Sequence, residues 1–246
     1  MITLNGIQVT PTIFNDKTSQ VWNVQGISPI QNHVIWEFEN EAEFMHVAQL
    51  VALLNKEAPE STVLEIPFFP YARQDKKIGN HETFAGHVFV ELLKTLNVRV
   101  VTHDIHSTDL LEKSWVNLTP EAQVKKIMED EYIELVCFPD EGAWRRYGKF
   151  VETEPLIAEK TRDPLTGNIT AYNIPATRHE VMFKKILIWD DLCDGGATFI
   201  MCAKELYKLG ALEVQLFTTH GIYSKGVQVL KDAGIVKIFN RKGEVK

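Results

Sequence analysis

Three carboxylates and a glycine turn lie within residues 190–198 of the sequence, DDLCDGGAT. The apolar residues 183–189 predict a buried strand before this segment, and the residues after it show helical spacing. Gly195 and Gly196 would therefore lie at the N-terminus of a helix, where free backbone N–H groups and the helix dipole bind an anion. Carboxylates next to this turn repel a bare phosphate but accept hydrogen bonds from sugar hydroxyls. The segment favours a phosphorylated sugar as ligand.

Three other interpretations of this segment were weighed. A Walker loop requires a lysine directly after the glycine turn, and none is present. An EF-hand counted from Asp190 would place Leu192 and Met201 where calcium needs oxygen ligands. A plain helix start capped by Asp194 remains the simplest alternative, although such a cap needs only one carboxylate.

Composition and charge exclude several classes of protein. The 246 residues are 45% hydrophobic and 24% charged, which is typical of a soluble globular chain. The formal charge of −7 disfavours nucleic acid as a partner, because such binding relies on clustered lysine and arginine. Three cysteines, Cys137, Cys193 and Cys202, are too few for a disulfide framework. No targeting segment and no membrane partner are expected, so we predict a cytoplasmic protein.

Strand and helix patterns alternate along the chain, which predicts an α/β fold with mostly parallel sheets covered by helices. The predicted strands are residues 61–69, 98–102, 135–138, 155–158, 183–189 and 214–218. Short strands are also expected within residues 20–38. Helices are predicted at 41–56, near 142–152, around the apolar stripe of Phe84, Val88, Leu92 and Leu96, and around that of Phe199, Ala203, Leu206 and Leu209. The polar segment 113–132 marks the boundary, giving domains 1–118 and 119–246.

Ligands bind beyond the carboxyl ends of parallel strands, so the residues that follow each strand are candidates for a site. Arg73, Lys76 and Lys77 follow one strand and could bind a polyphosphate. Asp104 and His106 follow another, and two positions apart on a strand they would share a face suited to a metal. The alternatives are a solvated charged face and a structural histidine.

Five segments together resemble the ribose-phosphate pyrophosphokinases, or PRPP synthetases. They are residues 14–18 (FNDKT), 66–77 (IPFFPYARQDKK), 102–106 (THDIH), 138–142 (FPDEG) and 190–198. The resemblance runs in order through most of the chain. It implies two phosphoribosyltransferase-like domains, an N-terminal domain that binds ATP and a C-terminal domain that binds ribose phosphate.

The resemblance also implies roles for individual residues. Phe14 would stack on the adenine and Asp16 would accept a hydrogen bond from it, while His106 and Asp140 would help to hold Mg²⁺. The implied ATP-binding set is Phe14, Asp16, Arg73, Gln74, Asp75 and His106. The implied ribose-phosphate set is Asp190, Asp191, Asp194, Gly195, Gly196, Ala197 and Thr198.

Residues 159–167 resemble the catalytic loop of the same family, which would make Lys160 and Arg162 the catalytic cations. In the implied reaction the anomeric hydroxyl of ribose 5-phosphate takes the β,γ-diphosphate of ATP and AMP leaves. Phosphoryl transfer of this kind mainly needs cations and in-line positioning. The alternative for these residues alone is an exposed hairpin with ordinary surface charges.

Departures from the family pattern suggest a short, divergent member. Gly195 stands where the family commonly has threonine, so a hydroxyl donor to the 5-phosphate is missing. A larger acceptor such as ADP-ribose is therefore a further hypothesis that links the chain to NAD metabolism, with Trp144 or Tyr147 stacking on its base. The chain would lack the family's first strand–helix unit and its last strand and helix, which leaves the usual subunit packing and nucleotide control in question.

Two other classes remain open. A PRPP-dependent phosphoribosyltransferase shares the acidic loop but would not use ATP, and a regulatory relative would bind these ligands without turnover. In the family the adenine loop reaches a neighbouring subunit, so Phe14 and Asp16 also suggest a homo-oligomer.

Overall fold

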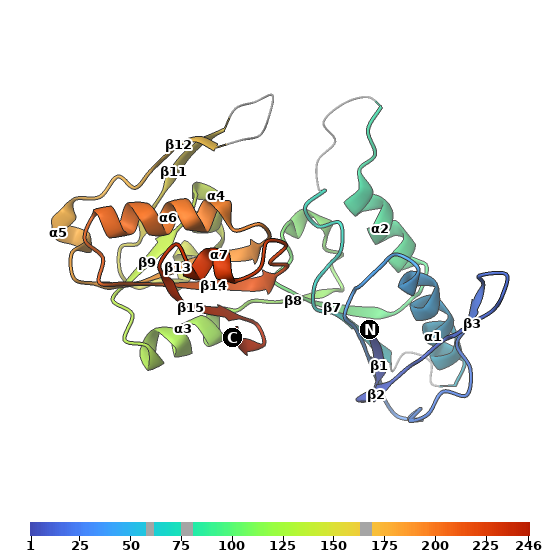
Figure 1. Ribbon diagram of the computed structural model, residues 1–246. Helices are drawn as coiled ribbons and strands as arrows, with labels where there is room; N and C mark the ends of the chain where they lie inside the picture. The colour runs from blue at the N-terminus through green and yellow to red at the C-terminus, as the bar shows by residue number, and fades with distance from the viewer. Residues whose placement is uncertain (58–61, 75–80, 163–168) are drawn as a thin grey trace. The chain divides into compact units, whose positions relative to one another are not determined.

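The computed structural model describes residues 1–57, 62–74, 81–162 and 169–246. The side chains of Arg162, Ile169 and Thr170 are outside the described part. The chain forms two compact units, Met1–Thr119 and Pro120–Lys246. Each unit contains a six-stranded, mainly parallel sheet with helices beside it (Figure 1). The predicted α/β class is thereby confirmed.

The sheet of the first unit has the strand order β2-β1-β5-β6-β7-β8. Its strands are β1 (Ile2–Leu4), β2 (Ile7–Gln8), β5 (Asn32–Trp36), β6 (Thr62–Ile66), β7 (Arg99–His103) and β8 (Val116–Leu118). Strands β5 to β8 are parallel, whereas β1 pairs antiparallel with β5 and with β2. Buried and half-buried residues alternate along β5 and β6, so one face of this sheet forms the core.

Two helices connect the parallel strands of the first unit, α1 (Glu43–Glu57) and α2 (Ala85–Lys94). The sequence pattern predicted the wrong buried face for α2. Val88 and Leu92, which belong to the predicted apolar stripe, are 53% and 46% exposed. The buried residues are instead Phe89, Val90 and Leu93. The helix has apolar residues around most of its circumference, and the Phe89 ring selects the buried side by packing against Phe69 and Trp36.

A separate β-hairpin follows the first two strands and is made of β3 (Thr12–Ile13) and β4 (Ser19–Gln20). Near the end of the unit, the short helix η1 (Thr108–Leu110) precedes β8. Short strands were predicted within residues 20–38. The structure has β5 in this range, and β4 ends at its first residue, Gln20. Sequence patterns missed the antiparallel extension by β1 and β2, because strands of two or three residues are too short to show periodicity.

The sheet of the second unit has the strand order β10-β9-β13-β14-β15-β16. Its strands are β9 (Leu135–Phe138), β10 (Leu156–Ile157), β13 (Lys185–Cys193), β14 (Glu213–Gly221), β15 (Ile235–Asn240) and β16 (Gly243–Glu244). All neighbours are parallel except β15 and β16. The two long central strands, β13 and β14, are buried along most of their length, as expected when helices cover both faces.

Five α-helices, one 3₁₀ helix and one β-hairpin accompany this sheet in the described part of the chain. They are α3 (Glu121–Asp130), α4 (Glu141–Tyr147), η2 (Gly148–Phe150), α5 (Arg178–Val181), α6 (Ala197–Lys208) and α7 (Gln228–Lys231), together with the hairpin of β11 (Glu159–Arg162) and β12 (Ile169–Asn173). The predicted helix near 142–152 is shorter than expected, because regular helix ends at Tyr147 and continues only as η2. The segment 113–132 contains β8 and α3.

The strand before the glycine turn also differs from its prediction. It begins at Lys185, because Phe183 has a left-handed backbone with φ of 64° and is 70% exposed. It ends at Cys193, so Asp190 and Asp191 belong to the strand and do not follow it. The neighbouring strand β14 explains the extension, since its pairing with β13 continues from Asp190 to Cys193.

Tyr147 is a core residue, which corrects the hypothesis that it could stack on a ligand's base. Only 1% of its surface is exposed, and its ring stacks on Trp189 with the ring centroids 4.6 Å apart. Phe138 and Phe217 complete this aromatic cluster around Trp189. Helix α4 is therefore fixed to the sheet by packing of its last residue.

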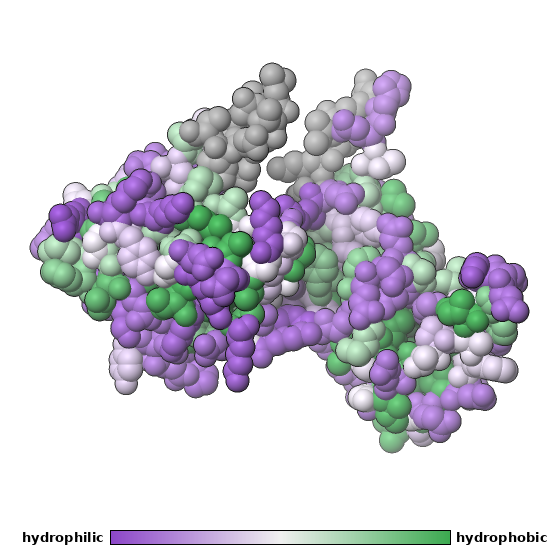
Figure 2. Space-filling view, viewed as in Figure 1, coloured by the Kyte–Doolittle hydropathy of each residue, from purple (hydrophilic) through white to green (hydrophobic). Residues whose placement is uncertain are grey.

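The outer surfaces are polar where helices face solvent. Figure 2 shows mostly hydrophilic side chains over α3, in agreement with the two buried residues of that helix, Val124 and Ile127. Among the residues described by the structure, no helix combines the length and apolar character needed to cross a membrane.

Candidate functional site

The glycine turn lies at the start of α6, as the sequence predicted. Gly196 is the N-cap and has a left-handed backbone with φ of 78°. A Cβ atom at this position would lie 2.8 Å from Leu230 Cδ2, so both the backbone angle and the space favour glycine. No side chain caps this helix, and Asp194 is therefore not its N-cap. The N–H groups of the first helical turn, which includes Ala197 and Thr198, point away from the helix and suit an anion.

Asp190 and Asp191 lie near the carboxyl end of β13, just before this turn. Asp191 is buried and forms an ion pair with Arg146, whose Nη1 lies 2.9 Å from Asp191 Oδ2. Asp190 Oδ1 accepts a hydrogen bond from the Asp191 backbone N–H at 2.9 Å. Burial raises the pKa of Asp190 well above its usual value, and the negative charges of Asp191 and Asp140 raise it further. The three carboxyl groups therefore influence one another, and Asp190 favours its protonated form.

Asp140 follows β9, and each of its two carboxylate oxygens makes a separate interaction. Its Oδ1 caps α4 by accepting a hydrogen bond from the Ala143 backbone N–H at 2.9 Å. Its Oδ2 forms an ion pair with the Lys160 ammonium. Burial favours the protonated form, but the Lys160 ammonium and the backbone N–H groups outweigh it and hold the pKa of Asp140 below its usual value. Asp140 is consequently an ionised carboxylate at the edge of the sheet.

Lys160 comes from the β11–β12 hairpin, where it pairs with Tyr172 in the opposite strand. The Tyr172 hydroxyl donates a hydrogen bond to the Pro139 carbonyl at 3.1 Å, next to Asp140. The hairpin is thus attached to the end of β9 at two points. Arg162 lies at the end of β11, where the register shifts, and its side chain is outside the described residues.

The structure therefore gathers most of the predicted residues of the second unit at one edge of the sheet. Sequence reasoning assigned no role to Arg146, although this residue brings a cation to Asp191. A helical spacing of three from the buried Ala143 could have shown that Arg146 faces inward. Trp144, by contrast, is 40% exposed, so it remains available to a ligand.

In the first unit, Arg73 and Gln74 are exposed on a tight turn after β6. The turn is closed by a 2.8 Å hydrogen bond from the Gln74 N–H to the Tyr71 carbonyl, and Tyr71 has a left-handed backbone with φ of 62°. Gln74 and Tyr71 line a hollow of about 550 Å³ at the carboxyl ends of β5 and β6. Asp75, Lys76 and Lys77 lie outside the described residues.

His106 and Asp104 do not share a strand face, contrary to the prediction. Strand β7 ends at His103, and Asp104 has a left-handed backbone with φ of 46°. The chain turns there because the Asp104 and Ile105 N–H groups are bound by Leu118 and Asn117. Asp104 is consequently buried, whereas His106 is exposed.

Phe14 and Asp16 lie in the turn of the β3–β4 hairpin. Phe14 is 41% exposed, and Asp16 Oδ1 accepts hydrogen bonds from the Thr18 hydroxyl at 2.7 Å and the Thr18 N–H at 3.0 Å. These bonds lower the pKa of Asp16. The carboxylate thus shapes the turn, while the Phe14 ring is presented to solvent.

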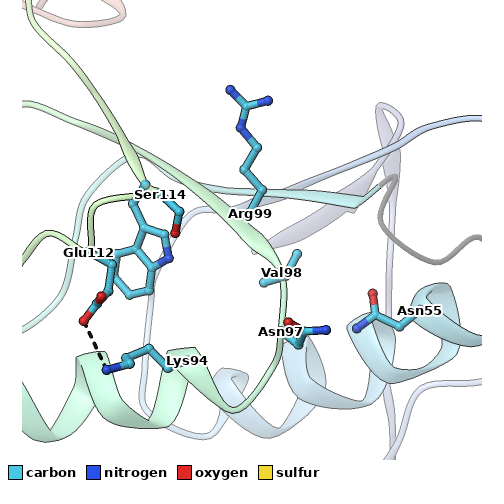
Figure 3. Close-up of a pocket in the computed structure, with 8 residues that line it drawn as sticks. Asn55, Lys94, Asn97, Val98, Arg99, Glu112 and Ser114 are labelled. Atoms are coloured by element: carbon cyan, nitrogen blue, oxygen red, sulfur yellow. Dashed lines mark ion pairs between the residues drawn. The ribbon is translucent and has the colours of Figure 1, made fainter.

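A larger hollow of about 710 Å³ lies at the opposite end of β7 (Figure 3). Lys94 and Glu112 form an ion pair across it at 3.2 Å, and Arg99 points away from this pair. None of the residues predicted for the site lines it. Its position at the amino end of the strand is not where parallel sheets bind their ligands.

Within the described residues, no group of three or more histidine, cysteine, aspartate or glutamate side chains has an arrangement that could hold a metal ion by itself. Mg²⁺ commonly binds through one or two protein carboxylates together with water and substrate phosphates. A magnesium site that depends on the substrate needs no such group.

Comparison with known proteins gives a consistent set of relatives, although no family model matches the chain. A "Ribose-phosphate pyrophosphokinase" of Maricaulis maris is 30% identical over 188 residues, which cover 72% of this chain and 59% of the relative. One of Thermosipho africanus is 27% identical over 208 residues, covering 79% of this chain and 64% of the relative. The matched part thus spans about three fifths of the length of these relatives.

The fold has a solved counterpart. A crystal structure of phosphoribosylpyrophosphate synthetase from Mycobacterium smegmatis superposes with a TM-score of 0.78 at 21% identity. It covers 95% of this chain and 79% of that chain. The shared fold therefore extends over both units.

Proposed function

Because the chain belongs to the ribose-phosphate pyrophosphokinase family, we propose that it transfers the β,γ-diphosphate of ATP to the anomeric hydroxyl of a ribose 5-phosphate unit. The observation that supports this most directly is the edge of the second sheet. There an anion-binding helix start, paired acidic residues and the Lys160 hairpin occur together.

The acceptor would bind to the second unit. Its 5-phosphate would accept hydrogen bonds from the backbone N–H groups that follow Gly196, and the half-buried Asp194 lies beside this position. Its ribose hydroxyls would donate to Asp190 and Asp191, which are carboxylates with lone pairs available for sugar hydroxyls. Arg146 fixes Asp191 in place through their ion pair.

In the transfer, the anomeric oxygen forms a bond to the β-phosphorus of ATP. The bond from the β-phosphorus to the oxygen shared with the α-phosphorus breaks, its electron pair stays with AMP, and the hydroxyl proton is released to solvent. Lys160 and Arg162 from the hairpin, with Arg73 and Gln74 from the first unit, would bind the negatively charged phosphate oxygens. For this role Lys160 would leave its ion pair with Asp140 and pair with a phosphate instead. The ion pair with Asp140 would hold the lysine close to the phosphates before they bind.

Mg²⁺ fits the donors available, since Asp140 is an ionised carboxylate and this ion prefers oxygen ligands. The resemblance would have His106 help to hold the magnesium–ATP complex, and it would place Asp140 near a second metal ion. When bound, Mg²⁺ supplies positive charge to the phosphate oxygens of ATP. Phe14 and Asp16 would contact adenine from a hairpin that reaches the site of a second copy, which makes a homo-oligomer part of the proposal.

Two features of the second unit support a second candidate for the acceptor substrate. Gly195 offers no hydroxyl to the phosphate, and Trp144 is exposed on the helix that starts at Asp140. A phosphate diester has fewer free oxygens and needs fewer donors. ADP-ribose would therefore be accepted as well as ribose 5-phosphate, and its product would be ADP-ribose pyrophosphate.

One assay separates these possibilities. The protein is mixed with Mg²⁺ and ATP, and with ribose 5-phosphate, ADP-ribose or no acceptor, and AMP and the products are identified by mass spectrometry. AMP release that requires ribose 5-phosphate supports PRPP synthesis, while release that requires ADP-ribose supports the second candidate. Consumption of PRPP and a free base without ATP would instead show a phosphoribosyltransferase, and binding of ATP without any turnover would show a regulatory protein.

A further inference from the structure

We propose that Lys225 is a specificity-determining residue that binds the phosphate of the acceptor, an inference that rests on the proposed function. The residue lies in the loop after β14, outside every segment that the sequence motifs identified. Four observations lead to it, and all concern the second unit.

The loop after β14 is held against the start of the phosphate turn. The Ile222 and Tyr223 N–H groups both donate to the Cys193 carbonyl, at 2.8 and 3.2 Å. Cys193 is the last residue of β13 and is followed directly by Asp194 and the glycine turn. The position of the loop relative to the turn is therefore determined by backbone hydrogen bonds and does not depend on flexible side chains.

A tight turn then directs two polar side chains toward the glycines. The Gly226 N–H donates to the Tyr223 carbonyl at 2.7 Å, which places Ser224 and Lys225 at the two central positions of a β-turn. Tyr223 and Gly226 have left-handed backbones, with φ of 49° and 75°. The Tyr223 ring occupies the space where a side chain at Gly221 would lie, so the base of the turn is packed as well.

Lys225 lies across Gly195. A Cβ atom at Gly195 would be 3.5 Å from Lys225 Cε and 3.6 Å from Lys225 Cδ, with Ser224 Oγ at 3.8 Å. These are ordinary van der Waals distances, so the end of the lysine chain lies directly beside the place that a side chain at Gly195 would take. The ammonium group is attached to the Cε atom that makes this contact and is therefore held beside the anion-binding turn.

The charge of Lys225 is available at that position. The side chain is exposed, and no ion pair links it to any described residue. Lys160 and Arg146, by contrast, are paired with Asp140 and Asp191. A phosphate at the turn would thus meet one lysine with three N–H donors in place of a side-chain hydroxyl. The class of ligand is a sugar that carries a phosphate monoester or diester.

The test compares Lys225→Met with wild type and with Lys204→Met, an exposed lysine on α6 that serves as the matched control. Dissociation constants for ribose 5-phosphate and ADP-ribose are measured by isothermal titration calorimetry, and KM values for acceptor and ATP are measured where turnover occurs. Lys225→Met should weaken binding of the preferred acceptor and raise its KM by about 10-fold, as expected for one charge-assisted hydrogen bond, with kcat and the KM for ATP unchanged. Lys225→Arg should recover most of the affinity.

Three outcomes would overturn the inference. They are equal acceptor affinity in Lys225→Met and wild type, an equal loss in the Lys204→Met control, and a loss in kcat without a change in acceptor affinity. Because calorimetry needs no turnover, the result remains distinct from failure of the proposed reaction. A wild type that binds the acceptor through Lys225 but releases no AMP would overturn the reaction and support the binding role, whereas a wild type that binds neither acceptor would overturn both.

Discussion

The carboxyl edges of the two sheets differ in how they hold their charged residues. In the second unit, Asp191 and Arg146 form an ion pair in which the side chains are only 7% and 26% exposed, and Asp140 is bound by Lys160. In the first unit, Arg73, Gln74 and His106 lie exposed on turns. The proposed acceptor side is thus organised by buried or half-buried ion pairs, whereas the side proposed for the nucleotide carries its polar groups on exposed turns. Preorganised groups lose less freedom on binding, so we expect the second unit to determine acceptor selectivity.

The largest expected effect concerns the lysine that joins the hairpin to the acidic edge. Lys160→Ala should lower kcat by about 10³-fold or more, because the transferred phosphate oxygens lose a cation where charge develops. AMP release under saturating ATP and acceptor measures it, and circular dichroism tests whether the fold is intact. A near-normal kcat in a folded variant would remove Lys160 from the proposed mechanism and weaken the contrast between the two edges.

Two neighbouring arginines on α4 allow the buried pair to be tested against an exposed one. Arg146→Ala should cost about 3 kcal/mol of unfolding free energy, because Asp191 is left buried without its cation. Arg145 pairs with Glu141 at 2.7 Å with both side chains mostly exposed, so Arg145→Ala should change stability by less than about 0.5 kcal/mol. Urea denaturation of both variants gives the comparison. Equal losses would show that burial does not distinguish the two pairs.

Substitutions at the two adjacent glycines should have different effects, one on stability and the other on acceptor binding. Gly196→Ala should destabilise the protein by about 1–3 kcal/mol, because φ is positive and Leu230 occupies the space of the new methyl group. Gly195→Ala has room for its methyl group and should leave the melting temperature nearly unchanged, yet it should weaken acceptor binding because the methyl group hinders the approach of a phosphate to the backbone. Calorimetry measures both properties. A stable Gly196→Ala variant, or a Gly195→Ala variant with full acceptor affinity, would contradict this division of roles.

The smallest effect is a gain in stability at the acidic edge. The pKa of Asp190 is raised in the folded protein, so its folded state holds a proton that the unfolded chain releases, and stability falls as pH rises from the ordinary carboxyl range through the raised pKa. Asp190→Asn removes this loss and should raise the melting temperature at pH 7, which differential scanning calorimetry measures. The difference should disappear as the pH approaches 4, near the ordinary pKa of aspartate. A variant that is less stable than wild type at pH 7 would show that Asp190 is well accommodated as an ion.

Much of the fold could be predicted from periodicity. The parallel strands of both sheets and helices such as α1 and α6 occur near their predicted positions, because their apolar spacing is long enough to detect. The buried face of α2 was not predictable, since Val88 and Leu92 are as apolar as the residues that are buried. Its orientation depends on aromatic partners from other elements.

The candidate site shows the same division. The residue types at the ends of strands indicated the position of the site. The left-handed backbone at Asp104, however, places its side chain away from that of His106. The ring of Tyr147 packs on Trp189 and is not available to a ligand. Both outcomes depend on contacts with residues distant in the sequence. Periodicity contains no information on such contacts.

The sequence by itself determined the strand, turn and helix around residues 190–198, because glycine supplies a positive φ locally and apolar spacing specifies the elements on either side. Only the tertiary structure decided which charges meet there. Arg146, Lys160 and Lys225 reach this turn and its neighbours from three separate segments, and their positions follow from the order of strands in the sheet and from the loops joined to them. Strand order is set by packing between residues far apart in the sequence, and a local sequence pattern does not predict it.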